Sequence, residues 1–162
     1  FPYTTLFRSN YTALIAAGGI GSGRAMAAAF ALGAQGVQIG SRFVTTQESS
    51  AHINFKNAIV EAKEGDTQLS LKQLTPVRLL KNPFFEKVSE LEKSGASSEE
   101  LTNLLGRGRA KKGMFEGDLT EGELEIGQVS GGIDKIQTVK EVVDEIVKEY
   151  NTVIKKLEGV YL

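Results

Sequence analysis

The fold of this chain is decided by two short stretches, Ile15-Ala16-Ala17-Gly18-Gly19-Ile20 and Gly36-Val37-Gln38-Ile39-Gly40-Ser41. Each runs from apolar residues into glycine, which is typical of a buried parallel strand that ends in a tight turn; we expect strands over residues 11–17 and 36–40. Between them, residues 23–32 are small residues and strong helix formers. The order strand, helix, strand predicts a βαβ unit with parallel strands and a right-handed crossover.

The boundaries of this helix are also marked in the sequence. Ser22 is placed to cap its first turn, and Gly33 is placed to end it in a left-handed conformation. Further along, the pattern predicts a connector over residues 41–46, a short strand over 69–71, and helices over 48–64, 83–93, 98–105 and 138–157. In the helix over 48–64, the candidates for the inner face are Ile53, Ile59, Val60 and Ala62. No internal repeat or linker marks a second independent domain.

Composition narrows the classes of function. The chain has 162 residues, 41% hydrophobic and 24% charged, which is typical of a soluble globular protein. A net charge of −1 gives no reason to expect a nucleic acid or an anionic membrane as partner. The absence of cysteine excludes disulfides and thiolate metal sites, and no apolar run approaches the roughly 18 residues of a membrane span. We therefore expect a cytoplasmic enzyme without a metal that acts on a small molecule, and the oligomeric state stays open.

The glycines at the two strand ends favour a phosphate site. Glycine lets backbone amides approach a phosphate without a clash at Cβ, and the first turn of the following helix offers further amides. Gly40 and Ser41 add an amide and a hydroxyl from the second strand end. In (β/α)8 barrels the loops after the last two strands are the usual phosphate site. A dinucleotide fingerprint fits less well, because the glycines at 18, 19, 21 and 23 are out of register.

Charged residues near these loops have simpler interpretations. Arg24 and Arg42 flank the candidate phosphate loops, but such arginines pair with carboxylates more often than with phosphate. The basic run over residues 107–112 lacks interleaved aromatic residues and is followed by acidic ones, so a solvated loop is favoured over a nucleic-acid site.

Residues 14–62, with the strand ends above and the stretch Ala31-Leu32-Gly33-Ala34-Gln35-Gly36 between them, resemble the nitronate monooxygenase family. Residues 123–131 resemble, more loosely, a glycine-glutamine loop that these enzymes carry after the barrel. The flavin-dependent enoyl-acyl-carrier-protein reductases share the same stretch. The resemblance implies an α/β fold, the carboxy-terminal part of a (β/α)8 TIM barrel with a helical carboxy-terminal extension, and FMN as cofactor.

The same resemblance implies which residues bind FMN: Gly18, Gly19, Ile20, Gln38, Ile39, Gly40 and Ser41. Gln128 and Ser130 could project toward the flavin from the later loop. The chain departs from the family pattern where Gly21-Ser22 replaces a small residue and aspartate, where Ala25 replaces glycine, and where Ser41 replaces threonine. Ser22 can cap a helix as aspartate does, and Ser41 keeps the hydroxyl. The family's general base is a histidine on an earlier strand. His52, the single histidine, lies in a predicted helix, so no catalytic residue is assigned.

Three functions stay open. The first is oxidation of alkyl nitronates with O2, and the second is reduction of enoyl thioesters with NADH or NADPH. The third is a non-catalytic phosphate-binding module or an inactive truncated fragment. Residues 1–9 resemble a translated sequencing adapter joined to a reading frame that begins near Asn10. A barrel that lacks its front strands would expose sheet edges, and we would then expect poor solubility.

Overall fold

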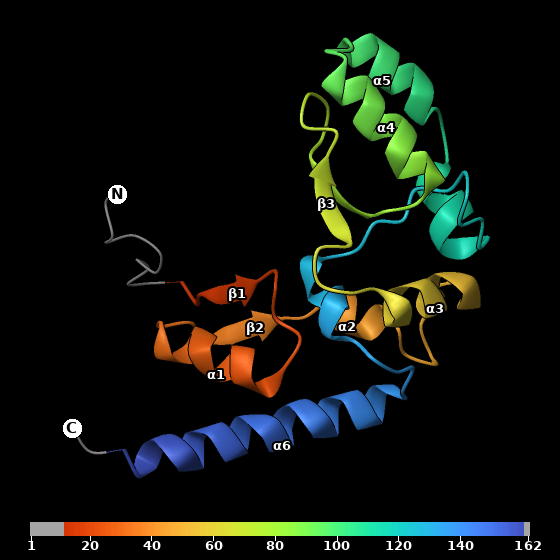
Figure 1. Ribbon diagram of the computed structural model, residues 1–162. Helices are drawn as coiled ribbons and strands as arrows, with labels where there is room; N and C mark the ends of the chain where they lie inside the picture. Colours follow the sequence, from red (N-terminus) through yellow and green to blue (C-terminus); the bar gives the residue numbers. More distant parts are fainter. Residues whose placement is uncertain (1–11, 161–162) are drawn as a thin grey trace.

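A computed structural model describes residues 12–160 of the chain, so the expected adapter segment lies outside the described residues. The elements in chain order are β1 (Ile15–Ala17), α1 (Gly23–Ala31), β2 (Gly36–Gln38), α2 (Ser41–Val44), α3 (Ile53–Glu61), β3 (Thr67–Ser70), β4 (Val77–Leu80), α4 (Pro83–Lys93), α5 (Ser98–Leu105), the π-helix η1 (Lys111–Phe115), the 3-10 helix η2 (Gln128–Gly132) and α6 (Val139–Glu158). Figure 1 shows β1, α1 and β2 beside α6, with α2 and α3 in the middle and α4 and α5 at the far end.

The predicted βαβ unit is present. β1 and β2 pair in parallel, with Ile15 opposite Gly36. The Ser22 hydroxyl accepts a hydrogen bond from the Ala25 amide at 3.1 Å, and Gly33 has φ +101°, as expected for the two ends of α1. Both strands are shorter than predicted, because each pairs with one neighbour and the ladder extends only where the two overlap.

Helix α6 packs against α1 at close range. A Cβ added to Gly23 would lie 2.2 Å from the Ile146 carbonyl oxygen and 2.3 Å from the Tyr150 amide nitrogen. The Tyr150 ring also meets the edge of Phe30, with ring centroids 5.6 Å apart. Glycine at position 23 therefore sets how near the two helix axes approach, and α6 covers the outer side of the βαβ unit (Figure 1).

The middle of the molecule differs from the sequence prediction. Residues 41–46 contain the short helix α2, and α3 begins only at Ile53. The loop between them is held by Lys56, whose Nζ donates to the carbonyl oxygens of Thr46 at 2.7 Å and Ser49 at 2.8 Å. On the predicted inner face Ile59 is buried, but Ile53 is 53% exposed and Phe55 is buried instead.

The far part of the molecule is a hairpin covered by two helices. β3 and β4 pair antiparallel, and the sequence analysis missed β4. α4 and α5 occupy their predicted ranges. Their apolar sides form a core with the hairpin, made of Leu71, Phe84, Val88, Ala96 and Leu101. None of the helices within residues 12–160 is long and apolar enough to cross a membrane.

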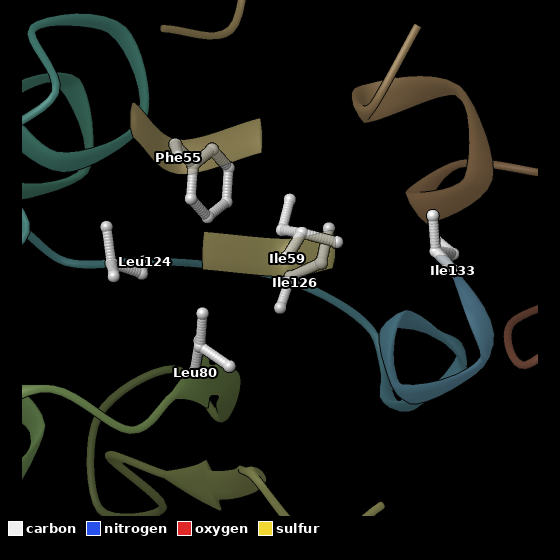
Figure 2. Close-up of a cluster of buried hydrophobic side chains, with 6 residues drawn as sticks. All are labelled: Phe55, Ile59, Leu80, Leu124, Ile126 and Ile133. Atoms are coloured by element: carbon white, nitrogen blue, oxygen red, sulfur yellow. The ribbon is translucent and has the colours of Figure 1, made fainter. Parts of the chain in front are cut away.

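A second core joins this hairpin to the middle of the molecule. Figure 2 shows its six buried side chains, Phe55, Ile59, Leu80, Leu124, Ile126 and Ile133. They come from α3, from the end of β4 and from the segment on either side of η2. Ile126 before η2 and Ile133 after it are both held in this core. They place η2 next to the ends of β1 and β2.

Candidate functional site

A cavity of about 260 Å³ lies where the ends of β1 and β2 meet η2. Its lining residues are Ala17, Gly18, Gly19, Ile20, Gln38, Gly40, Ser41, Gly127 and Val129. Of the predicted site residues, only Ile39 is missing from this lining; its side chain packs against the small core of the βαβ unit. Neighbouring side chains of an extended segment point to opposite faces, so Gln38 faces the cavity where Ile39 faces α1.

The glycines leave their backbone open to a ligand. Gly18 has φ +83° and Gly19 has φ +70°, a left-handed conformation that glycine adopts without strain. A Cβ added to either residue, or to Gly40, would meet no heavy atom within 4 Å. The space beside these three backbones is therefore free, and a side chain at any of them would partly fill it. This cradle fits an anion bound by main-chain amides.

Two amides in the first turn of α1, which we expected to face a phosphate, are paired within the protein. The Gly23 amide donates to the Glu149 carboxylate at 2.8 Å, and the Ala25 amide donates to Ser22. Arg24 also pairs with Glu149, at 3.4 Å. A carboxylate from α6 thus occupies the positive end of α1, where the helix dipole favours it. The candidate donors along the cavity lining are the loop amides of Gly18, Gly19 and Gly40 and the Ser41 hydroxyl.

Arg42 does not line the cavity. Its side chain is buried, and Nη2 donates to the Gln137 side-chain oxygen at 2.5 Å and lies 3.6 Å from the Glu145 carboxylate. The pKa of Glu145 is held below its usual value, mainly by the hydrogen bond from the Gln137 side chain. A hydrogen bond and the positive charge of Lys135, and the positive charge of Arg42, lower it further. The arginine therefore ties α2 to the start of α6.

Ser41 connects the two strand ends with the later loop. Its Oγ accepts a hydrogen bond from the Gly127 amide at 3.0 Å. Gly127 and Val129 line the cavity, whereas Gln128 is exposed and Ser130 is buried. The sequence analysis chose the second pair. Residues 128–132 form the 3-10 helix η2, and nothing in the sequence alone says which side of this turn faces the cavity.

His52 lies away from the cavity. It is the N-cap of α3, and its Nδ1 accepts a hydrogen bond from the Asn54 amide at 3.1 Å. The ring packs against Gly117, where an added Cβ would lie 2.2 Å from Nδ1. Among the residues that line the cavity in the described part of the chain there is no histidine, so the geometry assigns no general base.

The chain is similar to several known proteins. The chain matches the protein-family model described as nitronate monooxygenase over residues 11–149. A probable nitronate monooxygenase of Bacillus subtilis strain 168 is 33% identical over 137 residues, or 84% of this chain and 39% of that protein. Among solved structures, FabK from Thermotoga maritima is 42% identical with a TM-score of 0.83, covering 90% of this chain and 46% of that chain.

A nitroalkane oxidase from Streptomyces ansochromogenes is 28% identical with a TM-score of 0.68, covering 88% of this chain and 40% of that chain. The chain thus spans less than half the length of each of these three relatives. The predicted fold class is confirmed: the chain has the α/β fold of the carboxy-terminal part of a (β/α)8 barrel, with a helical carboxy-terminal extension.

Proposed function

The chain belongs to the nitronate monooxygenase family, and from this premise we propose that it binds FMN by the phosphate, in the cavity between β1, β2 and η2. One observation carries the proposal: two parallel strands end side by side in glycines whose backbones border free space, and Ser41 lies between them and η2. The cavity of about 260 Å³ lies below the usual 300–1,000 Å³ of a whole ligand site. It therefore accounts for the phosphate end of the cofactor.

Each residue type has a distinct task at this site. Gly18 and Gly19 bring main-chain amides to the phosphate oxygens, which a Cβ would keep at a distance. Gly40 keeps the space beside the second strand end open. The Ser41 hydroxyl donates to a phosphate oxygen, a charge-assisted bond that is stronger than a neutral one. Ile20 and Val129 add apolar walls that exclude water from the cradle.

We further propose that the reaction is oxidation of an alkyl nitronate with O2. When bound, FMN supplies the redox chemistry, since it takes electrons from a substrate and returns them to an acceptor. A proton acceptor for the substrate would come from outside the cavity described above. The second candidate, reduction of an enoyl thioester with NADH or NADPH, is favoured by the greater likeness to FabK than to the nitroalkane oxidase.

A titration with two flavins tests the binding proposal. FMN and riboflavin differ only in the phosphate, so quenching of flavin fluorescence by the chain should show at least tenfold tighter binding of FMN. Gly40→Val should remove that preference, because its side chain fills the cradle. Gly159→Val is the matched control, since an added Cβ there has only an ordinary contact at 3.8 Å and Gly159 lies outside the cavity lining. Equal affinity for the two flavins would contradict a phosphate site.

Anaerobic reduction separates the two reactions. If the chain with bound FMN bleaches on mixing with an alkyl nitronate and not with NADH or NADPH, the nitronate reaction is supported. Bleaching by a nicotinamide nucleotide alone would favour the enoyl reductase. The same mixtures without protein give the background rates.

A further inference from the structure

The segment of residues 127–132 touches the loops after both strands of the βαβ unit. At one end, Ser41 accepts the Gly127 amide at 3.0 Å, and a Cβ on Gly127 would lie 2.6 Å from the Ser41 oxygen. Further along, Val129 lies over Gly21, where an added Cβ would come within 2.4 Å of Val129 Cγ2. The segment therefore packs closely against the loop after each strand, at Ser41 and at Gly21.

The far end of this segment is fixed in the protein core. Ile133 belongs to the apolar cluster of Figure 2 and is 3% exposed. Within the segment, the Ser130 amide donates to the Gly127 carbonyl, which forms the turn of η2. The Ser130 hydroxyl is buried and has no hydrogen-bond partner among the described residues, which leaves a polar group whose burial is not compensated. The segment is thus anchored on both sides, because Ile126, directly before it, is buried in the same cluster and its amide donates to the Arg78 carbonyl at 3.0 Å.

The Ser41 hydroxyl can serve two partners at once. A hydroxyl has acceptor lone pairs and one donor hydrogen. Its oxygen accepts from Gly127, so the hydrogen is available to an anion in the cavity. Donation to an anion increases the negative charge on the oxygen and strengthens the bond that it accepts. Anion binding and docking of the segment should therefore favour each other.

We propose that residues 127–132 form a strap over the cofactor phosphate, and that Ser41 couples the packing of this strap to phosphate binding. The inference rests on the proposed FMN site and adds the backbone of residues 127–132 to it. It also explains why the strap meets the βαβ unit at Gly21 and Ser41, the residues that follow the two glycine-ended strands.

Hydrogen–deuterium exchange of the whole chain, with and without saturating FMN, tests the coupling. We expect FMN to slow exchange in peptides that cover residues 127–132, and riboflavin to slow it much less. In Ser41→Ala the FMN affinity should fall by about 10- to 100-fold, as expected for one charge-assisted hydrogen bond. At saturating FMN this variant should keep fast exchange in the strap. Ser41→Thr retains the hydroxyl and should behave as the wild type.

A second pair of variants keeps the test independent of Ser41. Gly21→Ala should displace Val129 and weaken FMN binding severalfold, although position 21 donates no side-chain bond to the phosphate. Gln73→Ala, at an exposed position outside the strap and the cavity lining, should leave both readouts unchanged. If wild-type protein does not bind FMN, the proposed function fails. If FMN binds and exchange in residues 127–132 does not change, the site stands and the strap is overturned.

Discussion

The βαβ unit that carries the site and the hairpin with its two helices are stabilised in different ways. In the βαβ unit the apolar core is Ile20, Ala29 and Ala34, each 8–9% exposed. In the hairpin region Phe84 and Val88 are completely buried, at 0% exposure. Burial of apolar surface stabilises a protein by about 25 cal/mol per Å². The large side chains of the hairpin core therefore contribute more to the free energy of unfolding than the small ones of the βαβ unit.

The difference shows what a backbone phosphate site requires. Small residues let main-chain amides approach a ligand, but they bury little apolar area. The βαβ unit is held instead by polar contacts from distant segments: Glu149 caps α1, Gly127 bonds to Ser41, and Arg42 holds Gln137. We therefore expect mutations in the hairpin core to affect stability most, and mutations around the site to affect ligand binding more than stability.

The largest effect on stability should come from Phe84→Ala. Phe84 is fully buried, and the Arg109 guanidinium lies 4.9 Å from its ring centroid. Loss of this ring should lower the free energy of unfolding by about 3–5 kcal/mol, measured by urea denaturation. Phe115→Ala is the control, because Phe115 is 50% exposed and should change little. A loss for Phe84→Ala no greater than that of the control would refute the contrast between the two regions.

Lys56→Met should give the next largest loss. The buried ammonium group donates to the carbonyl oxygens of Thr46 and Ser49, and the loop that it holds links the βαβ unit to α3. Methionine has similar length but cannot donate, so these oxygens lose a charged partner. We expect a loss of about 2–3 kcal/mol in the free energy of unfolding. Lys81→Met, at an exposed position, should be nearly neutral in the same denaturation series.

Gly23→Ala probes the contact between α1 and α6. An added methyl group would clash with backbone atoms of Ile146 and Tyr150, which cannot rotate away. We expect a loss of about 1–3 kcal/mol, and thermal unfolding followed by circular dichroism should show it. Gly132→Ala, with free space beside it, should show no loss from steric clash. Equal melting temperatures for the two variants would argue against close packing of α6 on α1.

A further expected effect is a pH dependence of stability that comes from Glu123. Burial, with a contribution from the charge of Glu125, raises the pKa of Glu123 from 4.5 to about 7. Folded protein then binds this proton more tightly than unfolded chain, so the free energy of unfolding should fall as the pH rises from about 4.5 to about 7.

Glu123→Gln should remove this decline and stabilise the protein above pH 7, because the amide carries no charge that burial opposes. Urea denaturation at a series of pH values measures it, and Glu116→Gln at an exposed position should keep the wild-type profile. A decline that survives in Glu123→Gln would assign it to another group.

Local signals predicted several elements well. The limits of α4 and α5 agree with the periodicity, because Asn82 and Ser97 are strong helix caps directly before apolar, amphipathic runs. The ends of α1 follow in the same way from Ser22 and Gly33. β4 was missed because its run, Val77-Arg78-Leu79-Leu80, is short, and its pairing with β3 depends on a turn that the sequence marks only weakly.

The sequence by itself determined the parallel βαβ unit, the glycine-ended strands and the candidate phosphate loops, because these depend on contacts between residues close in the chain. Only the tertiary structure decided which amides are free and which residues complete the cavity. Glu149 reaches α1, and Gly127 and Val129 reach the strand ends, across large separations in sequence. Such contacts depend on how whole elements pack, and residue patterns along the chain do not encode them locally.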